Sequence, residues 1–295
     1  MASQKIRSLM LPIAMIGGAI FYPWMDNLSF ISPYLIFLML FITYCRLDFR
    51  HIKIERFQFA IISVQMIMAA AVYFLLLPFS HTVAEGVCLC VFIPTATAAP
   101  VITAMLGGSI SRVATLSLIG NLLTSVLAPL VLAAIGDNHL PYLQSFLMIL
   151  KKVMPLLLMP IAAAFILKYT CPKFHQAITN HQSISFYIWA LALFIIVGCC
   201  VSFTINNFRI DRLPDIIALA TGAFVVCVMQ FAVGRKIGGK YGDKVSGGQG
   251  LAQKNTVLAV WLALAYMNPI ASIAPAAYIA WQNMINSYQL MKYRQ

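Results

Sequence analysis

The chain has 295 residues, of which 61% are hydrophobic and only 9% are charged. So few charged residues cannot coat a water-soluble globule, because the polar surface would be too small. The formal net charge of +12 would suit nucleic-acid binding only on a soluble basic surface, which this composition does not provide. The composition therefore predicts an integral membrane protein whose surroundings are the lipid bilayer, and it predicts no nucleic-acid partner.

Apolar runs recur along almost the whole chain, separated by short polar breaks. A helix needs about 20 apolar residues to cross a hydrocarbon core of roughly 30 Å. The pattern predicts an all-α protein of about ten transmembrane helices in a single membrane domain over residues 1–295. The expected spans are 8–25, 28–45, 58–78, 83–106, 110–136, 145–168, 183–205, 213–234, 244–267 and 269–290.

Most of the cations fall at the two ends of the chain or in connections after even-numbered spans. They include Lys5, Arg7, Arg46, Arg50, Lys53, Arg56, Arg112, Lys168, Lys173, Arg235, Lys236, Lys240, Lys244, Lys292 and Arg294. Only Arg209 and Arg212 clearly lie in a connection after an odd-numbered span. Because cytoplasmic loops carry an excess of Lys and Arg, we expect a multi-pass protein of the cell's inner (plasma) membrane with both termini in the cytoplasm.

The predicted spans divide into two groups of five, over residues 1–136 and 141–290. An odd number of spans in each half means that the second half enters the membrane upside down, which is the geometry of an inverted repeat. The fourth span of each half is interrupted, by Pro94, Thr95, Thr97, Pro100 and Thr103 in one and by Gly247, Gly248, Gln249, Gly250, Gln253, Lys254 and Asn255 in the other. Two broken helices at corresponding positions indicate a transport site, and their exposed backbone predicts that they cross.

Several motifs at these positions are similar to those of a known family. The stretches are 98–103 (Ala-Ala-Pro-Val-Ile-Thr), Gly108, 123–129 (Leu-Thr-Ser-Val-Leu-Ala-Pro), 249–254 (Gln-Gly-Leu-Ala-Gln-Lys) and 273–278 (Ile-Ala-Pro-Ala-Ala-Tyr), followed by Gln282 and Asn283. Together they resemble the bile acid:sodium symporter family. The resemblance implies a core domain of spans three to five and eight to ten, a panel of spans one, two, six and seven, and transport of an organic anion with sodium.

The chain departs from that family at the positions that the resemblance assigns to sodium. One implied site falls on Ala99, Pro100, Val113, Ser117 and Gln249, which supply few oxygen ligands and no carboxylate. The second falls on Gln65 and Gln253, which remain. A hard cation prefers several oxygens with a carboxylate among them. We therefore expect Ser117, Gln249, Gln65 and Gln253 to be remnants of cation sites, and no metal-binding residues or cofactor are predicted.

Lys254 stands where the family has asparagine, at the second break. A lysine in the middle of a membrane is costly and is usually placed against a cavity, a carboxylate or a substrate. The sequence predicts that its ammonium group replaces a coupling cation, either permanently charged or exchanging a proton (H⁺) during the cycle. The candidate ligands of a small organic anion are Thr97, Pro100, Thr103, Asn121, Lys254 and Asn255.

We interpret the chain as a secondary transporter of a small organic anion that works by alternating access. Two alternatives remain open: a sodium-coupled symporter that uses Gln65 and Gln253, and a sensor or receptor that binds without transporting. An enzyme is not expected, because no catalytic motif lies in the spans. A channel is disfavoured, because nothing resembles a selectivity filter. The sequence carries no signal for an oligomeric state.

Overall fold

The computed structural model describes residues 2–46, 53–136, 141–181, 183–206 and 209–293. Within these ranges the chain is helical, and six segments are long and apolar enough to cross a membrane. They are Tyr22–Arg46, Arg56–Leu76, Ile110–Ile135, Tyr142–Thr170, Ile184–Asn206 and Ile210–Lys240. The predicted class, a membrane-embedded helical protein, is confirmed at this level.

The first part of the chain forms seven α-helices. They are α1 (Ala2–Ile20), α2 (Tyr22–Met25), α3 (Ser32–Arg46), α4 (Arg56–Leu76), α5 (His81–Phe92), α6 (Ala99–Met105) and α7 (Ile110–Ile135), with a 3-10 turn at Asp26–Ile31. The segment expected to be one span over 8–25 is interrupted at Phe21. Pro23, in the first turn of α2, lacks an N–H group and cannot continue the hydrogen bonding of α1.

The second part begins with α8 (Tyr142–Thr170) and a short helix, α9 (Pro172–Asn180). It continues with α10 (Ser183–Asn206), α11 (Leu213–Lys240), α12 (Lys244–Ala252), α13 (Thr256–Tyr266) and α14 (Ile273–Tyr293). Short 3-10 turns at Ile210–Arg212 and Pro269–Ser272 precede α11 and α14. The expected interruptions at 94–103 and 247–255 are narrower in the structure: the gap between α5 and α6 covers residues 93–98, and the gap between α12 and α13 covers residues 253–255. Pro100 and Thr103 therefore lie within α6, and residues 247–250 lie within α12.

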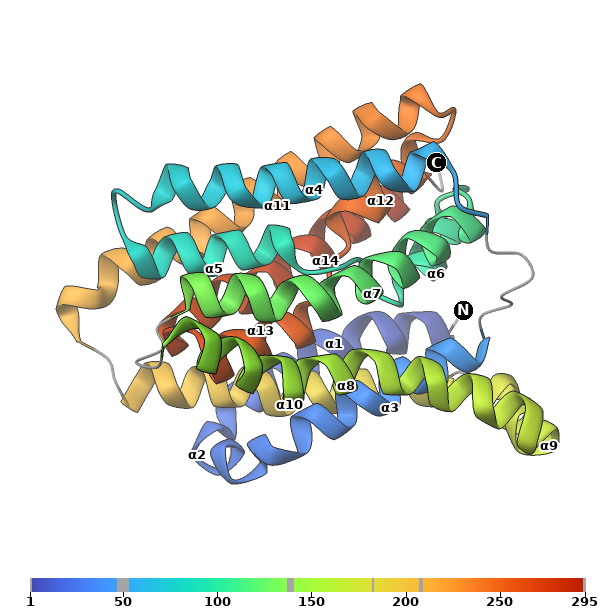
Figure 1. Ribbon diagram of the computed structural model, residues 1–295, viewed down its shortest axis with the longest axis horizontal. Coiled ribbons are helices and arrows are strands. Elements are labelled where there is room, and N and C mark those ends of the chain that lie inside the picture. The colour runs from blue at the N-terminus through green and yellow to red at the C-terminus, as the bar shows by residue number, and fades with distance from the viewer. Residues whose placement is uncertain (1, 47–52, 137–140, 182, 207–208, 294–295) are drawn as a thin grey trace.

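The long helices run roughly side by side along the longest axis of the molecule (Figure 1). The start of α1, the α8–α9 connection, the α11–α12 turn and the end of α14 all lie toward one end in this view. The start of α5 and the start of α11 lie toward the opposite end. The four cation-rich segments named first are thus gathered at one end, which we call the basic end.

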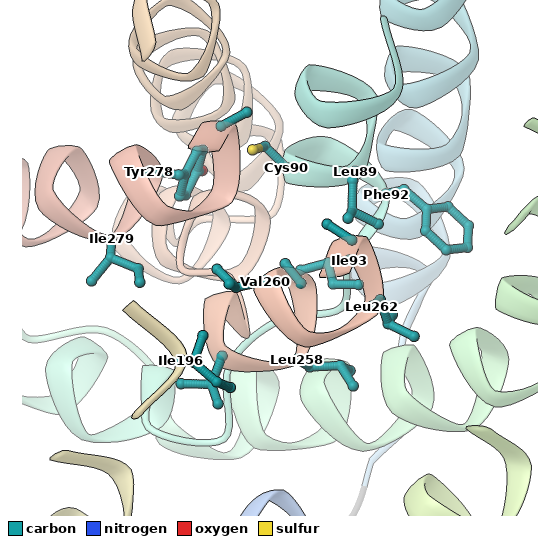
Figure 2. Packing of buried hydrophobic residues seen from close by; sticks show 14 of the residues in the cluster. Leu89, Cys90, Phe92, Ile93, Ile196, Leu258, Val260, Leu262, Tyr278 and Ile279 are labelled. Atoms are coloured by element: carbon teal, nitrogen blue, oxygen red, sulfur yellow. The ribbon is translucent and has the colours of Figure 1, made fainter. Parts of the chain in front are cut away.

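The core packs around α13, most of whose side chains are buried. Figure 2 shows Leu258, Val260 and Leu262 of α13 among side chains of α5, α10 and α14. These residues belong to one large cluster of buried apolar side chains. A helix that is apolar on all sides can face either lipid or other helices, and the burial of α13 shows that it is surrounded by helices. The half-helix α13 therefore lies in the interior of the bundle, although it is too short to cross a membrane alone.

Helices α11 and α12 approach each other more closely than side chains would permit. A Cβ atom on Gly247 would fall against the carbonyl oxygen of Gly234 and 2.6 Å from the Cα atom of Gly238. Small residues allow helix backbones to come into direct contact, which is a common way of packing helices where water is absent. Glycine at these positions thus fixes where α12 lies against α11.

A polar cluster at the basic end joins the α11–α12 turn to α7. The carboxylate of Asp243 accepts hydrogen bonds from the backbone N–H groups of Ser246 (2.9 Å) and Ser109 (3.0 Å) and from the Ser246 hydroxyl (2.5 Å). Arg112 forms an ion pair with Glu55 (2.9 Å) and donates to the carbonyl oxygen of Tyr241 (3.0 Å). Burial by itself would raise the pKa of Asp243, but the hydrogen bonds from Ser246 and Ser109 and the charge of Arg112 lower it.

We expect Asp243→Ala to reduce the free energy of unfolding by about 1–2 kcal/mol, because an N-cap and two further acceptor bonds are lost. Asp243→Asn, which keeps an acceptor oxygen, should retain most of this stability. Since the folded pKa lies below that of a free aspartate, the stabilisation is present above about pH 4 and is lost as pH falls through the lowered value. Thermal unfolding in detergent measures both effects, and a wild-type midpoint for Asp243→Ala would contradict the prediction.

Candidate functional site: the crossing of two broken helices

The first break is set by a proline. Pro94 has no backbone N–H group and disfavours helical geometry at the residue before it, and Ile93 accordingly has φ −58° and ψ 146°. Helix α5 therefore ends at Phe92, and α6 begins at Ala99. The residues between them lie in extended or turn conformations and leave backbone groups without partners inside their own helix.

The second break separates α12 from α13 and contains no proline. Gln253 leaves the helical region, with φ −79° and ψ 93°. Asn255 then caps the new helix, since its side-chain oxygen accepts from the N–H group of Leu258 at 3.3 Å. An asparagine is a favoured residue at this position because it satisfies a free N–H group of the first turn.

The two breaks pair with each other in an antiparallel arrangement. The N–H group of Ala96 donates to the carbonyl oxygen of Gln253 (2.8 Å), and the N–H group of Asn255 donates to the carbonyl oxygen of Pro94 (3.0 Å). Thr95 lies opposite Lys254 in this β-bridge. The expected meeting of the two breaks is confirmed, and its centre is the pair formed by Thr95 and Lys254. We call residues 94–96 and 253–255 the crossing.

Side chains from the rest of the bundle satisfy the carbonyl oxygens at the ends of α5 and α12. Lys254 donates from Nζ to the carbonyl oxygens of Val91 (2.8 Å) and Ile93 (3.0 Å). Gln65 of α4 donates to those of Phe92 (2.8 Å) and Ile93 (3.0 Å).

At the end of α12, Thr95 donates to the carbonyl oxygen of Gly250 (2.6 Å), and Tyr278 donates to that of Ala252 (2.7 Å). Unpaired carbonyl groups in a water-free interior are costly. The crossing is therefore held together by the pairing of these groups.

Lys254 occupies the carboxyl end of the half-helix α5. Its side chain is among the largest in the molecule that are fully buried, with 1% exposure. The carboxyl end of a helix carries a partial negative charge and several free carbonyl oxygens, which is an environment that suits a cation. Among the described residues Lys254 forms no ion pair with a carboxylate. The acceptors of its ammonium group are the backbone carbonyl oxygens of Val91 and Ile93.

The four predicted remnants of cation sites are buried and take part in other bonds. Gln65 binds the end of α5, as described above, and the Ser117 hydroxyl donates to the carbonyl oxygen of Thr95 (3.0 Å). Gln249 donates to Asn286 (2.8 Å), and Gln253 accepts from Asn286. Gln65 and Gln253 have different partners, so the structure records no shared ligand set for them. The Gln65 amide and the Lys254 ammonium group both donate to the carbonyl oxygen of Ile93.

The predicted substrate ligands lie near the crossing with different degrees of burial. Thr97, which precedes α6, and Pro100, in the first turn of α6, are partly exposed. Thr103 is buried and donates to the carbonyl oxygen of Ala99 (2.8 Å) within its own helix. Asn121 on α7 and Asn255 are buried, and each keeps one polar atom without a partner: Oδ1 of Asn121 and Nδ2 of Asn255.

Four further polar residues belong to this region and were not predicted as site residues. They are Thr95, Thr256, Gln282 and Asn286. The i, i+4 spacing of Gln282 and Asn286 was a signal for one polar helix face, and it could have been used to find them. Thr95 and Thr256 gave no comparable signal, since threonine is common in apolar helices.

A separate apolar pocket of about 230 Å³ opens between α3, α9 and α10. Its lining consists of Leu38, Phe41, Ile42, Phe174, Ile178, His181 and Ile184. None of these residues belongs to the crossing. A pocket with this lining offers no cluster of hydrogen-bond donors, and it therefore does not form part of the candidate site.

No family model matches the chain, and no curated protein matches it either. The class of the protein follows from its own structure: a membrane-embedded bundle of apolar helices, with two short helix pairs that meet at a buried lysine.

Proposed function

We propose that this protein is a secondary transporter of a small organic anion, built as a divergent member of the bile acid:sodium symporter family. In this proposal the chain crosses the inner (plasma) membrane ten times as two inverted repeats, residues 1–136 and 141–290, with both termini in the cytoplasm. Spans four and nine are the broken pairs α5–α6 and α12–α13. Paired broken helices near a midplane are the best structural pointer to a transport site.

The observation that carries the proposal is the position of Lys254. Its ammonium group binds the carbonyl oxygens of Val91 and Ile93 at the end of α5. A bound metal cation would take oxygens of this kind, and the lysine supplies the positive charge covalently. The lysine thus fills the electrostatic role of a coupling ion while linking the two halves of the chain.

An anionic substrate fits this arrangement for two reasons. The crossing holds a cation without a carboxylate partner among the described residues, so its net charge favours an anion. In addition, the amide nitrogen of Asn255 and the hydroxyl oxygen of Thr256 are buried at the start of α13 without partners. The amino end of a helix is positively polarised and accommodates carboxylates.

We expect uptake of the substrate to be unchanged when sodium is replaced by choline, because Lys254 occupies the carbonyl oxygens that a sodium ion would need. The measurement is counterflow of labelled organic anions in proteoliposomes, with candidates first chosen by thermal shift. A permanently charged lysine gives the same uptake at every pH, whereas a proton-exchanging lysine gives uptake driven by a pH gradient. Collapse of uptake in choline would favour the sodium-coupled alternative, and binding without counterflow would favour a receptor.

A further inference from the structure

A row of buried amide side chains lines the contact between α12 and α14. Gln249 and Gln253 lie one turn apart at the end of α12, and Gln282, Asn286 and Gln289 lie on one face of α14, at i, i+4 and i+7. We call these five residues the amide seam. Two matching polar faces on neighbouring helices in a membrane protein mark either interhelical bonding or a hydrated path.

Hydrogen bonds link the residues of the amide seam one after another. Gln249 donates to Asn286 (2.8 Å) and to Gln289 (3.2 Å). Asn286 donates to Gln253 (2.5 Å), and Gln282 accepts from the backbone N–H group of Lys254 (3.0 Å). The amide seam thus runs from the half-buried Gln289, near the basic end, to the fully buried second break. This is roughly 10 Å at 1.5 Å per residue of helix.

Three atoms of the amide seam are buried without a partner. They are Oε1 of Gln249, Nε2 of Gln253 and Nε2 of Gln282, on side chains that are 0–1% exposed. Each of these glutamines bonds through only one of its two polar atoms. If no water lay between α12 and α14, these three polar atoms would have no hydrogen-bond partner. Each unpaired buried group would lower the free energy of unfolding.

The chemistry of these free atoms identifies what would satisfy them. They include one acceptor and two donors. A metal cation binds only acceptors and an anion binds only donors, whereas water does both and bridges neighbouring amides. We propose that the amide seam holds a chain of bound water molecules, which brings solvent from the basic end to the second break. This proposal concerns hydration alone and does not depend on transport.

Radiolytic oxidation tests the proposal, because an X-ray pulse produces hydroxyl radicals from water that is already in place. Two methionine variants at the α12 side form a matched pair: Gln253→Met lies in the amide seam, and Leu251→Met lies in an apolar cluster. Both native side chains are fully buried. We expect the introduced methionine of Gln253→Met to oxidise about tenfold faster than that of Leu251→Met, because methionine oxidation follows access to the oxidant. Mass spectrometry of the peptides gives both rates.

A second pair on α14 repeats the comparison if Gln253→Met does not fold. Asn286→Met lies in the amide seam, whereas Ile279→Met lies in the apolar core, and the native side chains are 4% and 0% exposed. Folding is checked by gel filtration and thermal unfolding. Equal, slow oxidation within a folded pair means that the amide seam is dry, and the proposal is then wrong. Suppression of the faster rate by sodium chloride but not by choline chloride means that the occupant is a cation, which also overturns it.

Discussion

Lys254→Met should abolish anion binding and uptake. The substitution keeps most of the apolar stem and removes the charge, so an anion at the crossing loses its counter-ion. Losing a buried charge partner costs about 2 kcal/mol or more, which corresponds to roughly a 30-fold or greater loss of affinity. The measurements are the anion-induced thermal shift of the purified protein and counterflow in proteoliposomes.

Removing the lysine also leaves the carbonyl oxygens of Val91 and Ile93 with fewer donors, so stability must be separated from binding. Gln65→Met provides the comparison, because it frees carbonyl oxygens at the same helix end and keeps the positive charge. We expect both variants to unfold at lower temperature, since an unsatisfied buried acceptor costs about 1–3 kcal/mol. Only Lys254→Met should lose the anion-induced shift. Normal transport by folded Lys254→Met would show that the lysine has a structural role alone.

Gly247→Val should prevent α12 from docking on α11 and should cause a larger loss of stability than Asp243→Ala, Lys254→Met or Gln65→Met. The new side chain would meet the backbone of Gly234 and Gly238, and neither can move aside as a flexible side chain would. Overpacking of a tight contact usually costs about 1–3 kcal/mol, and rigid backbone on two sides places this case at about 3 kcal/mol or above. Because α12 leads directly into the crossing, transport should be lost together with the fold.

Gly239→Ala is the control for this variant, since a Cβ atom there would meet only carbon atoms of the Lys244 side chain, the nearest at 3.3 Å. That side chain is flexible and can move. We expect Gly239→Ala to unfold close to the wild-type temperature, and Gly247→Val to be recovered poorly from membranes and to elute as aggregate in gel filtration. A well-folded Gly247→Val protein would mean that the α11–α12 contact is looser than the structure describes.

The first helix break could be placed from the sequence because its cause is local: Pro94 cannot donate a backbone hydrogen bond. The second break was placed only approximately, because the glycines at 247, 248 and 250 lie inside α12 and the helix is interrupted after them, at residues 253–255. Lys254 also stood out in the sequence, since a cation among apolar residues is rare and leads to the hypothesis of a functional site. The interruption at Phe21 was missed, although Pro23 gave a signal for it.

The partners of the site residues could not be predicted. Lys254 contacts a carbonyl group 163 positions earlier in the chain, and Thr95 contacts one 155 positions later. No periodicity or spacing encodes such a contact. The family resemblance placed Gln65 and Gln253 together as remnants of a cation site. Their hydrogen-bond partners could be found only in the structure, where Gln65 donates to the end of α5 and Gln253 joins the amide seam.

By itself, the sequence determined that the surroundings of this protein are lipid, that it is helical, and roughly where two of its helices are interrupted. These properties depend on the composition and on the backbone preferences of residues that are near one another in the chain. The tertiary structure alone decided which groups satisfy the broken ends and that the lysine caps a helix from the other half. It also decided that five amides from two segments form one seam. In a membrane interior every backbone polar group needs a partner, and only the three-dimensional packing of distant segments determines which partner each one finds.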